Sequence, residues 1–116
     1  MKSVIFASVL LASGAVTATE FVAADNTRET KLCMAAATGT PLKMMTTIKY
    51  SGYDDRSVAR GIACNDEPIN FFAARYNDDE RVVNRLNRFA RTKANVNIID
   101  LSQNQSGTLV IGGRAK

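Results

Sequence analysis

The sequence predicts a mainly α-helical fold, a small bundle of about five short helices stapled by one disulfide, with a candidate C-terminal β-hairpin. Three observations predict it. Several segments carry apolar residues at three- and four-residue intervals, which is the period of an amphipathic helix. The chain has only two cysteines, Cys33 and Cys64. Its 116 residues suffice for one small domain, whose limited core a covalent link would reinforce.

Residues 1–18 have the three-part layout of a secretory signal peptide. Lys2 supplies a positive charge, residues 4–16 are apolar or small, and Val16 and Ala18 place small residues at the cleavage site. The apolar run is too short for a comfortable membrane span. A buried N-terminal helix is the alternative, but no polar face interrupts the run. We therefore expect export to the periplasm, cleavage after Ala18 and no membrane span in the remaining chain.

The first helix is expected at residues 27–38, after a lead-in at residues 19–26 that could form an edge strand or pack onto the helix. Asn26 is the expected N-cap, and Glu29, three residues later, completes the pattern of a capping box. Gly39 is the expected stop, because glycine adopts the left-handed conformation that ends many helices.

The second and third helices follow the same logic. Pro41 is suited to the first position of a helix and predicts one over residues 42–50. The third is predicted over residues 56–63, with Asp54 or Asp55 as its cap. Two helices joined by a tight turn resemble a helix-turn-helix in outline, which alone is weak evidence for DNA binding.

The fourth and fifth helices carry most of the apolar pattern. The fourth is expected to end at Tyr76, with Asp66 as its cap, Pro68 in its first turn and Asn77 in a left-handed position after it. The fifth is expected over residues 80–90, and the three acidic residues at its start complement the helix dipole.

Three arginines form the candidate binding site of the sequence. Arg81, Arg85 and Arg88 follow one another at helical spacing, roughly opposite the apolar face of the fifth helix. We call them the arginine stripe. The stripe could bind phosphates, nucleic acid or an acidic protein. A plain solvated face is the alternative, and we favour it because nearby acidic residues can neutralise the arginines.

The chain changes character after the helical domain, which we place at residues 27–90. In the C-terminal extension, residues 91–116, the segments 96–101 and 108–111 read as the two strands of a hairpin. Residues 112–116 are basic and glycine-rich and are expected to be a frayed end.

In an oxidising compartment, two cysteines in a small exported domain are expected to be bridged. Closing a loop of about 30 residues stabilises the fold by roughly 3–4 kcal/mol. A redox-active thiol is the alternative. The chain has no Cys-x-x-Cys motif and no histidine to depress a thiolate pKa, so we favour a structural bridge.

Four short segments form a recognisable set: residues 32–37 (LCMAAA), 58–59 (VA), 64–65 (CN) and 69–76 (INFFAARY). Together they resemble a known family of small secreted proteins of Gram-negative bacteria, domain-of-unknown-function family 3718. The resemblance covers about residues 27–90. It implies a periplasmic helical domain in which Cys33 pairs with Cys64, and it supplies no catalytic residue.

The amino-acid composition narrows the range of possible functions. The formal net charge of +4 falls by one when Lys2 leaves with the leader, and a mildly basic chain favours anionic partners at low salt. The chain has no histidine, the commonest general base and metal ligand. We therefore expect no catalytic residue, no metal and no cofactor. The leading hypothesis is a non-catalytic periplasmic module that binds a protein or envelope component. Binding of an anion or nucleic acid by the arginine stripe is the alternative.

Overall fold

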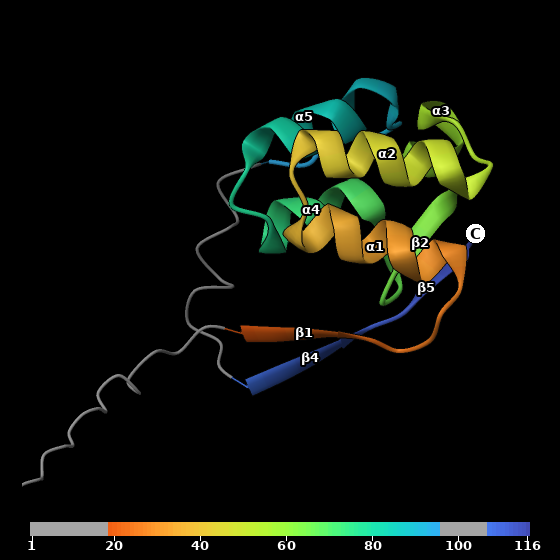
Figure 1. The fold of residues 1–116 in the computed structure, drawn as a ribbon. Coiled ribbons are helices and arrows are strands. Elements are labelled where there is room, and N and C mark those ends of the chain that lie inside the picture. The colour runs from red at the N-terminus through yellow and green to blue at the C-terminus, as the bar shows by residue number, and fades with distance from the viewer. Residues whose placement is uncertain (1–18, 96–106) are drawn as a thin grey trace, which may run out of the picture.

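The structure is a computed structural model that describes residues 19–95 and 107–116. The predicted signal peptide and the predicted strand at residues 96–101 lie outside the described residues. The expected five helices are confirmed, and their order along the chain is α1 (Arg28–Thr38), α2 (Pro41–Ser51), α3 (Asp55–Gly61), α4 (Ile69–Tyr76) and α5 (Glu80–Phe89). The fold is therefore mainly α-helical, as predicted (Figure 1).

Within residues 19–95 and 107–116, five short strands accompany the helices and form two small sheets. They are β1 (Thr19–Ala23), β2 (Ile62–Cys64), β3 (Glu67–Pro68), β4 (Gly107–Ile111) and β5 (Gly113–Ala115). One sheet pairs β1 with β4, and the other has the order β3-β2-β5. Because only Gly112 separates β4 from β5, one nearly continuous segment pairs first with the N-terminal strand and then with the middle of the chain.

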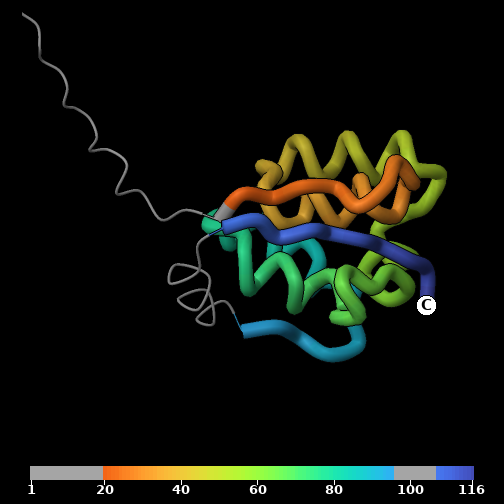
Figure 2. Tube along the Cα trace, turned by 90° about the horizontal axis from the view of Figure 1, so that it is seen from below, coloured from red at the N-terminus to blue at the C-terminus, as the bar shows by residue number. Residues whose placement is uncertain are grey.

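The N-terminal and C-terminal strands lie side by side and run parallel (Figure 2). Their register pairs Phe21 with Leu109 and Val22 with Val110. Phe21 and Leu109 pack against the core, whereas Val22 and Val110 are exposed, so the side chains alternate as in a half-buried sheet. The lead-in thus forms a strand, and the predicted strand at 108–111 is confirmed. Within the described part of the chain, its partner is β1.

Helix α1 is central to the packing. It contacts α2 on one side, α4 on another, and the strands β1, β4 and β5 on a third (Figure 1). Its core-facing residues are small apart from Leu32, and Ala35, Ala36 and Ala37 let the neighbouring helices approach closely. The largest fully buried side chain is Phe72 of α4, whose ring packs edge-to-face on Tyr76 at 5.0 Å between centroids.

The start and end of α1 differ from the prediction. Thr27, not Asn26, is the N-cap, and its hydroxyl accepts from the backbone nitrogen of Thr30 at 3.2 Å. Asp25 fixes this arrangement, because its carboxylate accepts from both the backbone nitrogen and the hydroxyl of Thr27. At the other end, Gly39 is extended (φ −88°, ψ 168°) rather than left-handed. Its N–H still donates to the carbonyl of Ala35 at 2.8 Å, so the helix ends without a left-handed residue.

Asn77 does not take the left-handed position predicted for it, since its backbone is extended (φ −95°, ψ 129°). Its side chain instead reaches the end of α1. The buried amide donates to the carbonyl oxygens of Ala36 and Gly39, both at 2.9 Å, and its oxygen accepts from the backbone nitrogen of Asp79 at 2.8 Å. Asn77 therefore caps a helix far from it in the sequence.

The predictions for residues 62–66 and 112–116 were also wrong, for a common reason. The third helix ends at Gly61 because residues 62–64 form β2, which pairs antiparallel with β5 in the segment predicted to be frayed. Asp66 is not the cap of α4. It lies in a left-handed turn (φ 67°), and its carboxylate accepts from Arg114 of β5. Pro68 occupies the cap position of α4 without a side-chain hydrogen bond.

Candidate functional site

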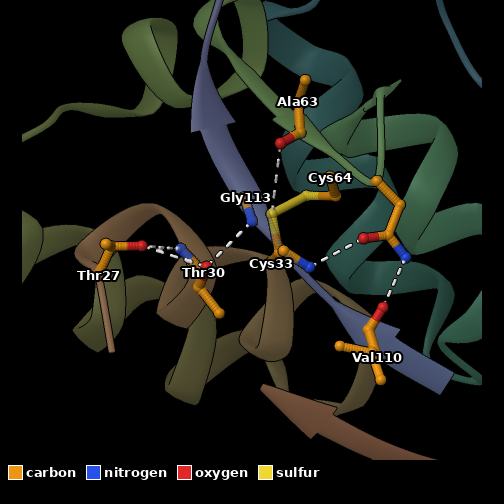
Figure 3. Close-up of a disulfide and its surroundings, with 9 residues drawn as sticks. Thr27, Thr30, Cys33, Ala63, Cys64, Val110 and Gly113 are labelled. Carbon is orange, nitrogen blue, oxygen red and sulfur yellow. Dashed lines mark hydrogen bonds between the residues drawn. A yellow bond between two sulfur atoms is a disulfide. The ribbon is translucent and has the colours of Figure 1, made fainter. Parts of the chain in front are cut away.

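The predicted disulfide between Cys33 and Cys64 is confirmed, and it joins α1 to β2 (Figure 3). The Cα atoms are 5.6 Å apart, and both residues are fully buried. The Sγ of Cys33 also lies 3.8 Å from the carbonyl oxygen of Ala63. Because no solvent reaches the sulfurs, this geometry fits a structural link between the first helix and the middle strand.

The arginine stripe lies on α5 as predicted, but two of its three guanidinium groups already bind carboxylates. Arg81 contacts Asp79 through two hydrogen bonds of 3.0 and 2.8 Å. These bonds hold the pKa of Asp79 below its usual value and raise that of Arg81. Arg85 makes two bonds of 3.1 Å to Asp55 of α3. Among the described residues, only Arg88 of the three makes no ion pair.

The pair formed by Arg85 and Asp55 is half-buried and connects two helices, so it contributes to packing as well as to surface charge. Removing Arg85 would leave Asp55 without its partner. Carboxylates therefore compensate two of the three stripe arginines, and Arg88 is the one that forms no ion pair with a described residue.

A second basic surface, which the sequence did not predict, lies in a groove between α1 and α2 with a volume of about 510 Å³. We call it the α1–α2 groove. Three cationic side chains line it: Arg28 and Lys31 from α1 and Lys43 from α2. No carboxylate is among the described residues that line it. Its volume lies within the range of about 300–1,000 Å³ that is usual for ligand sites.

The groove also offers apolar surface and hydroxyl oxygens. Ala35 and Met34 of α1 form its apolar part, and Tyr50 of α2 lines it while remaining 80% exposed. Thr38 donates its hydroxyl proton to the carbonyl of Met34 at 2.8 Å, and Thr47 donates to that of Lys43 at 2.7 Å. With their protons committed to the helices, these two hydroxyl oxygens are placed to accept hydrogen bonds from a ligand.

Arg28 is held in place at one end of the groove. Its guanidinium donates to the carbonyl of Ser51 at 3.1 Å and lies over the ring of Tyr53, 4.8 Å from the centroid. Glu29 approaches it to 3.4 Å and also accepts from the Tyr53 hydroxyl at 2.5 Å. That hydroxyl lowers the pKa of Glu29, and the carboxylate in turn raises the pKa of Tyr53.

Sequence reasoning missed this site because its cations come from two helices, and only tertiary packing brings Lys31 and Lys43 to one groove. Part of the signal was present. Arg28, Lys31, Ala35 and Thr38 are spaced by three or four residues, which places them along one side of α1.

Three further observations concern metal binding, membrane spanning and buried polar atoms. In residues 19–95 and 107–116, no group of three or more metal-ligating side chains lies together. None of the helices in the same residues is long and apolar enough to cross a membrane. Every buried side-chain nitrogen and oxygen in this part of the chain has a hydrogen-bond partner.

The fold and the groove define a small, disulfide-linked helical domain with a cationic surface between its first two helices. The chain belongs to the family described as "Protein of unknown function (DUF3718)", whose model matches residues 32–102, more than half of the sequence. This confirms the predicted family. The match ends at residue 102, beyond residue 90 where the resemblance was expected to stop, so the family pattern includes the part of the chain after α5 up to residue 102. Neither a curated protein nor a solved structure matches the chain.

Proposed function

We propose that this protein is an exported, non-catalytic binding module that holds a protein or another envelope component in the α1–α2 groove. The single observation that carries the proposal is the charge of the groove: three cationic side chains line it, and two of them, Lys31 and Lys43, form no ion pair with any described residue. Uncompensated charge beside apolar surface is the usual arrangement of a site that recognises an anionic partner.

The comparison with the arginine stripe supports the choice of site. On α5, Asp79 and Asp55 already occupy Arg81 and Arg85, so an anion there would have to displace a carboxylate. In the groove, Lys31 and Lys43 form no ion pair with any described residue. An incoming anion therefore gains their full attraction without breaking an existing contact.

Export to the periplasm is supported by two independent features. Residues 1–18 carry the charge, apolar run and small residues of a cleavable leader. The buried disulfide needs an oxidising compartment to form, and the periplasm is one.

A non-catalytic role is supported by where the acidic groups are engaged. The chain has no histidine, so a general base would have to be a carboxylate or a lysine. Asp54 caps α3, and the Ser57 backbone bond lowers its pKa. Glu67 binds Arg75 at 2.8 Å. These carboxylates serve helix starts and ion pairs rather than a reactive cleft.

Site-specific photocrosslinking in cells tests the proposal. A benzophenone amino acid replaces Thr47 in the groove or, as the matched position, the exposed Asn84 on α5 between Arg81 and Arg88. We expect ultraviolet light to give a defined adduct from position 47 and none from position 84. An adduct from position 84 alone would support the arginine stripe instead, and the absence of adducts from both would contradict the proposed binding role.

The same cells test the compartment. Osmotic shock should release a chain whose mass, measured by mass spectrometry, matches a sequence that starts at Thr19. A full-length chain retained in the cytoplasm would contradict export.

The arginine stripe stays the second candidate because Arg88 is exposed and makes no ion pair within the described residues. Binding of an anion or nucleic acid there would weaken steeply with salt. Replacing all three stripe arginines by glutamine should abolish such binding while leaving the groove adduct from position 47 unchanged.

A further inference from the structure

We infer that the occupant of the α1–α2 groove is an acidic peptide segment of a partner protein, with an apolar side chain between its acidic residues. This inference rests on the proposed function of the groove and adds the chemistry of the partner. Three features of the groove support this inference: the positions of its cations, its apolar floor and its hydroxyl oxygens that can accept hydrogen bonds.

The cations lie at both ends of the groove. α1 and α2 are joined by the short Gly39–Thr40 connection and lie side by side (Figure 1). Arg28 is at the start of α1, where it bonds to Ser51 at the end of α2. Lys43 is at the opposite end, and its stem approaches Gly39. At 1.5 Å per residue, the length of α1 separates the two ends by about 16 Å. Lys31 lies one turn in from Arg28.

This spacing fits a chain with several charges better than a molecule with one. A single-headed amphiphile such as a fatty acid has its charge at one end and would leave the other end of the groove unmatched. In an extended peptide each residue advances about 3.3 Å, so roughly five residues span the groove. Acidic residues four or five positions apart would meet the cations at the two ends.

The middle of the groove is apolar, so an apolar side chain of the partner would pack favourably there. Ala35 is 3% exposed and lies at the floor, with Met34 half-buried beside it. A flat bilayer surface would meet the rims of the groove before it reached Ala35. The groove also exposes an aromatic side chain, because Tyr50, which lines it, is 80% exposed. A peptide that fills the groove would cover Tyr50 as well.

The threonine hydroxyls distinguish a peptide from other anions. Thr38 and Thr47 donate to their own helices, so their oxygens accept from whatever lies in the groove. A peptide backbone offers N–H donors at regular intervals. A DNA backbone offers charge but no hydrogen-bond donor. The groove thus matches a peptide in charge, apolar contact and hydrogen bonding.

Selection from a random dodecapeptide library on the oxidised, exported chain tests the inference. We expect the enriched peptides to share acidic residues four or five positions apart that flank a large apolar residue. A synthetic, fluorescent peptide of that consensus should bind with an affinity that falls as sodium chloride rises from about 50 to 500 mM, because added salt screens exposed charges. Enrichment of peptides without this acidic pattern would overturn the inference.

Matched lysine substitutions place the binding in the groove. Lys31→Gln with Lys43→Gln should weaken binding of the consensus peptide about tenfold or more, which corresponds to about 1.4 kcal/mol. Lys49→Gln removes one such charge from α2 outside the groove and should change the affinity less than about twofold, whereas each groove substitution alone should weaken binding more than this control. Circular dichroism and thermal unfolding check that all variants fold. Equal effects of the groove and control substitutions would contradict the inference.

The alternative occupants are outcomes of the same assay. Stronger binding of phosphatidylglycerol vesicles or of a single-stranded oligonucleotide, lost in the groove variant and kept in Lys49→Gln, would overturn the peptide inference while leaving the groove as the binding site. A photoadduct from position 47 that contains no peptide would do the same. Only the absence of any groove adduct would defeat the proposed function itself.

Discussion

Gly113 packs directly against the sulfur of Cys33. A Cβ atom at position 113 would lie 2.7 Å from the Sγ of Cys33, and it would also overlap the backbone carbonyl of Glu29. The backbone nitrogen of Gly113 donates to the hydroxyl of Thr30 at 3.0 Å, which fixes β5 over the first helix (Figure 3). The last strand therefore crosses the disulfide with no side chain between them, and the glycine is needed for this approach.

The first prediction follows from this contact. Gly113→Ala should lower the free energy of unfolding by about 1–3 kcal/mol, because the added methyl group meets backbone and sulfur atoms that cannot rotate away. Urea denaturation measures the change. Gly61→Ala is the matched control, since a Cβ there has no atom within 4 Å and should leave stability nearly unchanged. If both alanines are tolerated equally, β5 does not pack on the disulfide.

The disulfide itself should supply a large part of the stability of so small a domain. The two cysteines are 31 residues apart, and opening a loop of this size should cost about 3–4 kcal/mol. Cys33→Ala with Cys64→Ala, or reduction of the native chain, should shift the urea midpoint strongly downward. The midpoint of the double variant should not respond to reductant, which serves as its control. A native chain with one midpoint in both oxidised and reduced forms would contradict the structural role.

Asn65 fastens the C-terminal segment next to the disulfide. Its amide donates to the carbonyl of Val110 at 3.0 Å, and its oxygen accepts from the nitrogen of Gly112 at 2.8 Å. Because Asn65 has φ 49°, a conformation that glycine adopts without strain, Asn65→Gly keeps the backbone geometry and removes these two side-chain hydrogen bonds. We expect a loss of about 1–2 kcal/mol, measured by urea denaturation, with faster amide hydrogen exchange at Gly112.

The next residue provides the control for Asn65. Asp66 also has a positive φ, but its side chain is 82% exposed, and its one ion pair with a described residue is with the exposed Arg114. Asp66→Gly should therefore change the stability by less than about 0.5 kcal/mol. If the two glycine variants behave alike, the backbone of the turn rather than the Asn65 side chain determines the stability.

The positions of the helices were predictable because their signals are local. Apolar spacing locates each helix, and residues such as Thr40 and Pro41 mark where α2 begins. The disulfide could also be predicted, since the two cysteines of a small domain that is expected to be exported leave only one pairing. Both inferences need no knowledge of which segments meet in space.

Prediction of the strands and of the groove would require knowing which distant segments of the chain meet in space. β1 and β4 come from opposite ends of the chain, and β2 has only three residues, too few for a pattern of its own. Asn77 reads as a stop for its own helix, yet its side chain satisfies carbonyls of α1, 38 and 41 residues away. Asn70 is similar, since its buried amide bonds to the carbonyl of Thr92 at 2.7 Å. The hydrogen-bond partners of such polar side chains can be assigned only once the packing of the helices is known.

The hydrogen bond from Tyr53 to Glu29 should make part of the stability dependent on pH. It lowers the pKa of Glu29 below the ordinary value of 4.5, so at intermediate pH the unfolded chain binds more protons than the folded chain. Its contribution is therefore fully present above about pH 4.5 and is lost as the pH falls through the folded pKa. In Tyr53→Phe the pKa of Glu29 should rise, and the two proteins should differ in unfolding free energy at pH 7 more than in acid.

Carbon NMR of the Glu29 carboxyl measures the change in its pKa, and urea denaturation measures the change in unfolding free energy. Tyr50→Phe, which alters an exposed tyrosine of α2, is the control and should leave the titration of Glu29 unchanged. A carboxyl that titrates at the same pH with and without the Tyr53 hydroxyl would show that this bond does not hold Glu29 beside Arg28 at the end of the groove.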